Sequence, residues 1–135
     1  MIRSFVLAAA GALLLSACSK DAEKADLSDP AAGLDEQIVA WRADLEASHP
    51  ACRTKVEGKG CEDFTVRCKA IQTITPDEQA KGVNSKIVAA VTFTGRMEDG
   101  SSGKNGSAFA DFARTGAAWT RTEAKPVNLS SCAPF

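Results

Sequence analysis

The sequence has little of what a metal or redox centre requires. It contains one histidine, His49, and its five cysteines include no C-x-x-C pair. Zinc sites are built largely from closely spaced Cys and His ligands, so a zinc site is not expected. The missing C-x-x-C pair also argues against a thiol–disulfide oxidoreductase. We therefore expect no metal and no cofactor.

Basic residues are neither in excess nor clustered. The chain has 16 Lys and Arg against 17 Asp and Glu, and no run of Lys or Arg is longer than two. A nucleic-acid partner is not expected, because it would need a basic patch. Six basic residues are candidates for a protein contact surface, although an ordinary solvated surface explains them equally well. They are Lys55, Lys59, Arg67, Arg96, Arg114 and Arg121.

The first residues have the layout of a signal peptide. Arg3 precedes an apolar run over residues 5–15, which is too short to span a bilayer as a helix, and small residues follow. The run ends at Leu15-Ser16-Ala17-Cys18. An uncleaved anchor helix and a plain secretory signal are the alternatives, but neither needs a cysteine at the cleavage site. Residues 1–17 are therefore predicted to be removed.

The segment Leu15-Ser16-Ala17-Cys18 resembles the lipobox of bacterial lipoproteins. The resemblance implies lipid attachment to Cys18, cleavage before it, and acylation of the new amino terminus, so the membrane is a partner through the lipid anchor. Ser19 stands where an Asp would retain the protein at the inner membrane, which implies an outer-membrane location facing the periplasm. Residues 18–33 are predicted to form the lipidated cysteine and a flexible tether, and residues 34–135 a single domain.

The remaining four cysteines indicate two disulfides, because an exported protein folds in an oxidising compartment. Four cysteines allow three pairings. We favour Cys52–Cys61, whose short loop contains Gly58 and Gly60, together with Cys68–Cys132, which would tie the C-terminal tail to an early strand.

The domain is predicted to begin with a helix. Leu34, Ile38, Trp41 and Leu45 recur at helical spacing, and Pro50 ends the pattern near His49. We expect Trp41 to be a core residue rather than a platform for a ligand. His49 is expected to be an exposed residue at the helix C-terminus.

Alternating patterns predict four strands, over residues 63–71, 86–96, 107–115 and 117–124. The first is expected to place Cys68 on its inward face. A short helix beginning at Thr75 separates the first two strands, and residues 98–106 are expected to be a loop ending in Asn105-Gly106. Phe109 and Phe112 would fall on opposite faces of a regular strand, so we expect a bulge or one exposed Phe.

These elements predict an α+β domain in which the N-terminal helix packs on a curved antiparallel sheet of about four strands, stapled by disulfides. Over residues 34–125 this architecture resembles the cystatin-like and NTF2-like α+β classes. An architectural resemblance does not imply a function.

Asp111 is the carboxylate of interest, because it lies in an otherwise apolar strand. In a pocket beneath the helix it would act as a general base, with Trp41 and Trp119 as further pocket candidates. On the solvent face it would be an ordinary polar residue, which is the favoured interpretation. The function predicted first is a non-enzymatic accessory protein that binds an envelope protein. The alternatives are a ligand-binding or enzymatic pocket beneath the helix, and an inhibitor or immunity-type protein.

Overall fold

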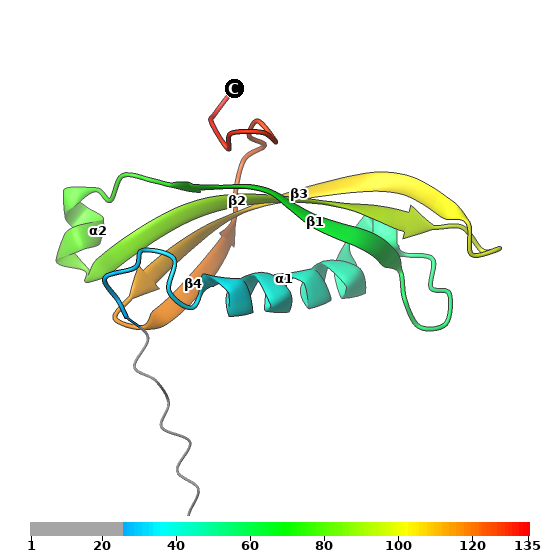
Figure 1. Cartoon of the computed structure of the whole chain (residues 1–135), viewed down its shortest axis with the longest axis horizontal. Coiled ribbons are helices and arrows are strands. Elements are labelled where there is room, and N and C mark those ends of the chain that lie inside the picture. Colours follow the sequence, from blue (N-terminus) through cyan, green and yellow to red (C-terminus); the bar gives the residue numbers. More distant parts are fainter. Residues whose placement is uncertain (1–25) are drawn as a thin grey trace, which may run out of the picture.

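The computed structural model describes residues 26–135, so the lipobox, Cys18 and the first part of the predicted tether lie outside the described residues. Within these residues, two α-helices, one 3₁₀ helix and four strands follow one another (Figure 1). In order they are α1 (Leu34–Ser48), η1 (Pro50–Cys52), β1 (Cys61–Ile71), α2 (Pro76–Ala80), β2 (Val83–Arg96), β3 (Ser102–Thr115) and β4 (Ala118–Glu123). Neither α-helix is both long and apolar enough to cross a membrane.

The four strands form one antiparallel sheet in the order β1-β2-β3-β4. The predicted α+β class, with one main helix and a four-stranded sheet, is confirmed. Strand β2 is central and pairs with β1 on one side and β3 on the other. Both faces of its sequence are apolar because α1 residues pack on one face and tail residues on the other.

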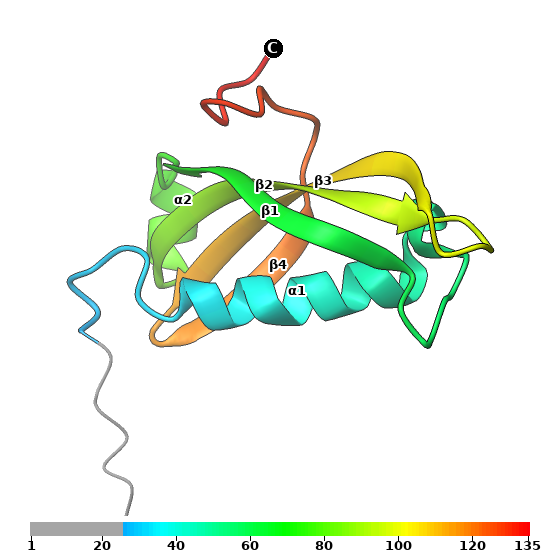
Figure 2. The ribbon, with the colours of Figure 1, turned by 45° about the vertical axis from the view of Figure 1, so that its right-hand side comes forward.

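Two apolar clusters lie on opposite faces of the sheet. In both ribbon views α1 runs along one face, and the C-terminal tail lies over the other (Figures 1 and 2). The first cluster joins buried residues of α1 to sheet residues, and the rings of Trp41 and Phe112 meet edge to face at 5.7 Å. The second cluster contains Val88 and Ala90 beneath Val127 and Cys132 of the tail.

A bulge in β1 moves Cys68 to the face opposite the one expected. The register between β1 and β2 shifts between Val66 and Cys68. Before the bulge, Phe64 packs against the α1-side cluster, whereas Cys68 after it packs against the tail-side cluster. The prediction of one continuous inward face was wrong, because an extra residue reverses every later side chain.

The turn between β2 and β3 is shorter than predicted. Asn105-Gly106 lies within β3, where Asn105 pairs with Thr94, and the turn falls at residues 97–101. There the Asp99 carboxylate accepts hydrogen bonds from the Ser101 backbone N–H and hydroxyl, and Gly100 adopts a positive φ of 84°. The Asp99 side chain stabilises a turn at residues 97–101, so the chain reverses there and not at Asn105-Gly106.

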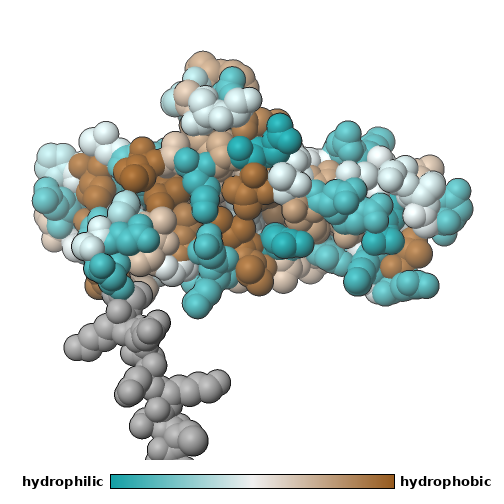
Figure 3. Space-filling view, viewed as in Figure 1, coloured by the Kyte–Doolittle hydropathy of each residue, from teal (hydrophilic) through white to brown (hydrophobic). Residues whose placement is uncertain are grey.

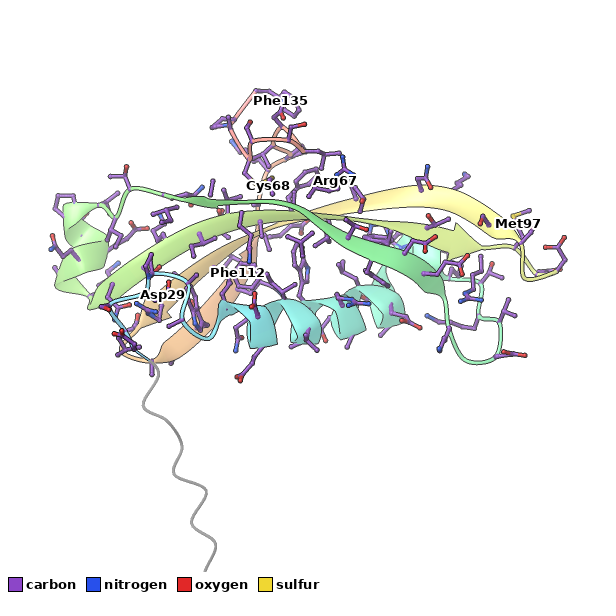
Figure 4. All side chains as sticks on the ribbon, in the orientation of Figure 1. Asp29, Arg67, Cys68, Met97, Phe112 and Phe135 are labelled. Carbon is purple, nitrogen blue, oxygen red and sulfur yellow. A yellow bond between two sulfur atoms is a disulfide. The ribbon has the colours of Figure 1, made fainter. Side chains whose placement is uncertain are left out.

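Between Phe109 and Phe112, strand β3 has neither the bulge nor the exposed Phe that was predicted; the β2–β3 register shifts instead near the start of β3, between Ser102 and Asn105. Phe112 is buried against α1 (Figure 4). Phe109 packs against the tail-side cluster from the other face. Both rings are accommodated because both faces of the sheet are covered at this point.

Two disulfides are present, joining Cys52 to Cys61 and Cys68 to Cys132. These are the pairs favoured from the sequence. The first links η1 to the start of β1, and the second links the tail to β1 across 64 residues of sequence. The tail is therefore a covalently held cover of one sheet face.

Candidate functional site

The candidate site is a notch in the sheet where β4 stops short. Strand β4 ends at Glu123, which pairs with Ala110, whereas β3 begins eight residues earlier at Ser102. Residues 102–108 of β3 therefore lie beside β2 on one side and have no strand from residues 26–135 on the other. After Glu123 the chain turns away toward the tail.

This part of β3 presents main-chain groups at an open edge. The Ala124 N–H donates to the Phe109 carbonyl at 3.0 Å, which is the last backbone bond along this edge. Backbone N–H and C=O groups alternate sides along a strand, so those of Ser107 and Asn105 point the same way as those of Phe109. Unpaired edge groups of this kind can accept another strand.

An open groove of about 480 Å³ lies beside this edge. Its α1 side is formed by Trp41, Leu45 and Pro50, and its far end by Ala124 and Pro126. The helix side thus combines these apolar residues with Ser48 and His49, and the polar edge of β3 forms one wall. This combination suits an extended peptide, whose backbone needs partners and whose side chains need pockets.

Charged residues at the groove are few. Arg121 of β4 forms an ion pair with Asp44 of α1, with 2.7 Å between Nη2 and Oδ2. The pair joins helix and strand across the groove, and Glu123 lies beside it among the lining residues. Because the ion pair is largely exposed, its contribution to stability is small, about 0.2–1 kcal/mol.

His49 also lines the groove. It is the C-cap residue of α1, which agrees with its predicted position at the helix end, but it is not exposed as predicted. Its side chain is half-buried, and its ring packs edge-on against Phe93 with 4.8 Å between centroids. Its Nδ1 accepts a hydrogen bond from the Ala51 N–H at 3.1 Å and so caps the N-terminus of η1. The extended backbone imposed before Pro50 places the ring there.

The structure does not bring the three predicted pocket residues together. Trp41 lies in the core and lines the groove, with 4% of its surface exposed. Trp119 packs against the same cluster from β4, but its Nε1–H donates to the Ala32 carbonyl at 2.9 Å, away from the groove. Asp111 pairs with Val88 and so faces away from α1, with one buried carboxylate oxygen that has no hydrogen-bond partner among the described residues.

Sequence reasoning placed Arg114 on an exposed contact surface, and the structure corrects this. Arg114 is 1% exposed, and its guanidinium donates to Asn84 and to backbone carbonyls of residues 27, 29 and 32. These residues belong to the predicted flexible tether, whose last part is thus bound to the domain. The sequence signal for this burial was strand alternation, because Arg114 lies on the same strand face as the buried residues Ala110 and Phe112.

Other surface features are dispersed. The remaining predicted basic residues do not form one patch: Lys55 donates to the Glu46 carbonyl and Arg96 pairs with Glu62 at 3.2 Å. On the face shown in Figure 3, apolar surface gathers over the centre and the α2 end, and the β2–β3 turn end is mainly hydrophilic. Within residues 26–135, no group of three or more acidic, His or Cys side chains is arranged to hold a metal ion.

The strongest electrostatic perturbation lies outside the notch, in α2. A hydrogen bond from Lys86, at 2.8 Å, lowers the pKa of Glu78 to about 2, assisted by the Thr75 backbone N–H. The pKa of Asp26 is also lowered, by hydrogen bonds from the Ser28 side chain and backbone. Both effects stabilise local turns.

The chain matches no family model, no curated protein and no solved structure.

Proposed function

We propose that this protein is a lipid-anchored accessory protein of the bacterial envelope that binds an extended segment of another envelope protein at the open edge of β3. The single observation that carries the binding role is the stretch 102–108, which is unpaired on one side among the described residues and whose end borders a groove of mixed polar and apolar lining. The proposed anchor is Cys18, facing the periplasm from the outer membrane, and rests on the lipobox resemblance.

The chemistry of the notch supports strand addition. A partner strand would continue the track of β4 and exchange backbone hydrogen bonds with Ser107 and Asn105. Its alternate side chains would enter the groove beside Trp41, Leu45 and Pro50. The main chain would provide affinity and the groove would select the side chain, without any catalytic group.

The rest of the molecule is consistent with a binding role. Anchoring confines a binding protein to one surface and raises its effective concentration there. The proposal requires α1 to stay packed on the curved sheet, because the helix forms one wall of the groove. The Trp41–Phe112 contact and the Arg121–Asp44 ion pair support this layer.

A single proline substitution on the open edge of β3 tests the proposal. Ser107→Pro would remove an N–H that faces the open edge and leave the β2–β3 ladder intact, because proline is tolerated at free edges. Ser107→Ala, which keeps the N–H, is the matched control. A photo-crosslinking residue in place of Lys104 would capture the bound segment in cells, and mass spectrometry would identify it. A synthetic peptide of that segment would then be titrated against each variant.

We expect the peptide to shift the backbone amide resonance of residue 107 in the wild type and in Ser107→Ala. We expect it to bind Ser107→Pro at least about tenfold more weakly. Equal binding by all three proteins would contradict strand addition. Thermal stabilisation by a small metabolite, with no cross-linked segment, would instead favour the alternative of a ligand pocket beneath the helix. A captured enzyme that loses activity when bound would identify the inhibitor alternative.

A further inference from the structure

A buried arginine holds the segment through which the chain enters the domain. We call residues 27–32 the strap. Arg114 donates through Nη1 to the Asp29 carbonyl at 2.9 Å and through Nη2 to the Leu27 carbonyl at 3.0 Å, and its Nε donates to Asn84 at 2.7 Å. Figure 4 shows Asp29 in the strap, close to the β3–β4 end of the sheet.

Two further side chains bind the same segment. The Ser85 hydroxyl donates to the Pro30 carbonyl at 2.5 Å, and the Trp119 indole N–H donates to the Ala32 carbonyl. The Arg114 guanidinium also lies over the Trp119 ring, 5.4 Å from its centroid. Three side chains from three strands, β2, β3 and β4, thus converge on one short segment.

The contacts recognise the main chain of the strap. Every strap atom that accepts these bonds is a backbone carbonyl oxygen, and in the described part of the chain no carboxylate is paired with Arg114. A buried cation is costly unless its donors are satisfied. Here the strap carbonyls satisfy them, so the arginine and the strap depend on one another.

We propose that Arg114, Trp119 and Ser85 form a clasp that holds the strap in place and sets how far the domain can move from its membrane anchor. The consequence for the membrane rests on the proposed anchoring at Cys18, but the clasp itself does not. With the strap held, the chain between Cys18 and Asp26 can span at most about 28 Å. If the strap were released, the free chain would reach Leu34 and span about 56 Å.

The clasp also determines which end of the domain lies next to the tether. The strap is bound where β3 turns into β4, whereas the groove lies at the C-terminal end of α1 and beside the far half of β3. The notch therefore lies at the end of the molecule away from the strap, where a partner can approach without meeting the anchoring surface.

Hydrogen exchange of the full chain, purified in detergent, tests the clasp. Amides of Asp29, Ala32 and Leu34 are bonded within the strap turns and report on its order. In Arg114→Met, which keeps an apolar side chain of similar length, we expect these amides to exchange at least about tenfold faster, because the bonds of a charged group are lost. Amides of the β2–β3 ladder should keep their protection. Arg67→Met, at an exposed position of β1, is the control and should leave the strap unchanged.

If Arg114→Met does not fold, the milder double variant Ser85→Ala with Trp119→Phe removes two of the three partners and gives the same readout. Unchanged exchange at residues 29, 32 and 34 in a folded variant would overturn the clasp.

The second measurement is the height of the lipidated protein above a supported bilayer, determined by neutron reflectivity. This height should increase in Arg114→Met. Faster exchange without a change in height would retain the clasp as a fold element and refute its control of reach. A chain found to carry no lipid would refute the anchor and leave the exchange result standing.

Discussion

At the scale of single residues, Gly106 and Phe93 show how closely two strands can be matched. They are direct partners in the β2–β3 register. A Cβ atom at position 106 would lie 2.3 Å from Cε2 of Phe93, well inside van der Waals contact. The absence of a side chain at Gly106 therefore lets the ring lie across the strand.

Gly106→Ala is expected to destabilise the protein by about 1–3 kcal/mol, because the methyl group must displace a buried aromatic ring. Urea denaturation measures the change. Ser107→Ala, at the next position, should alter stability by less than about 0.5 kcal/mol. In the background of Phe93→Leu the cost of Gly106→Ala should fall, and an unchanged cost in that double variant would contradict the steric explanation.

Glu78 is expected to make part of the stability depend on pH. Its pKa is lowered from 4.5 to about 2 in the folded protein, so its stabilising effect is complete above pH 4.5 and is lost as the pH falls toward 2. Glu78→Gln keeps the capping interaction with Thr75 but removes the charge that pairs with Lys86. The variant should be less stable than the wild type at pH 6, and the two should converge near pH 2. A stability difference that is the same at both pH values would rule out this ion pair as the cause.

At the scale of elements, the two disulfides close loops of very different length. Loop entropy predicts a stabilisation of about 4 kcal/mol for Cys68–Cys132 and about 3 kcal/mol for Cys52–Cys61. We expect Cys68→Ser with Cys132→Ser to be the more destabilising pair of substitutions, and to make the tail after Val127 sensitive to protease. Denaturation under non-reducing conditions and limited proteolysis check both effects. A tail that stays protected would mean that its apolar contacts hold it without the covalent link.

Local patterns predicted the elements well where the local signal matched the tertiary environment. The helix from Leu34 to the residue before Pro50 and the Thr75–Glu78 capping box were both recognisable from residue types alone. The central strand β2 was recognisable from apolar residues on both faces. In each case burial and local propensity favour the same conformation.

The errors came from features that alternation cannot reveal. The bulge near Cys68 reverses a face, and the tail that covers Phe109 comes from a distant part of the chain. The notch was unpredictable because it depends on where β4 ends relative to β3. Trp41 was predicted as a core residue and also as a pocket candidate, and it both lies in the core and lines the groove.

At the scale of the whole molecule, the proposed lipobox at residues 15–18 makes the clearest prediction. Cys18→Ala should prevent lipid attachment and leave the precursor uncleaved, because the resemblance makes Cys18 the site of both events. Metabolic labelling with a fatty-acid analogue and the mobility of the precursor on a gel check both effects. Release of mature protein of normal size from the Cys18→Ala strain would contradict the lipoprotein assignment.

The position of Cys132 near the end of the chain has a consequence for the order of oxidation. If the chain enters the periplasm from its N-terminus, Cys52 and Cys61 arrive close together and can pair at once. Cys68 follows immediately, but its partner lies 64 residues further along the chain. If export keeps pace with synthesis, at roughly 5–20 residues per second, Cys68 would wait for roughly 3–13 s as a free thiol beside a newly formed disulfide. Under the proposed export, the correct pairing would thus depend on the Cys52–Cys61 bond resisting attack by its neighbour until the last residues have crossed the membrane.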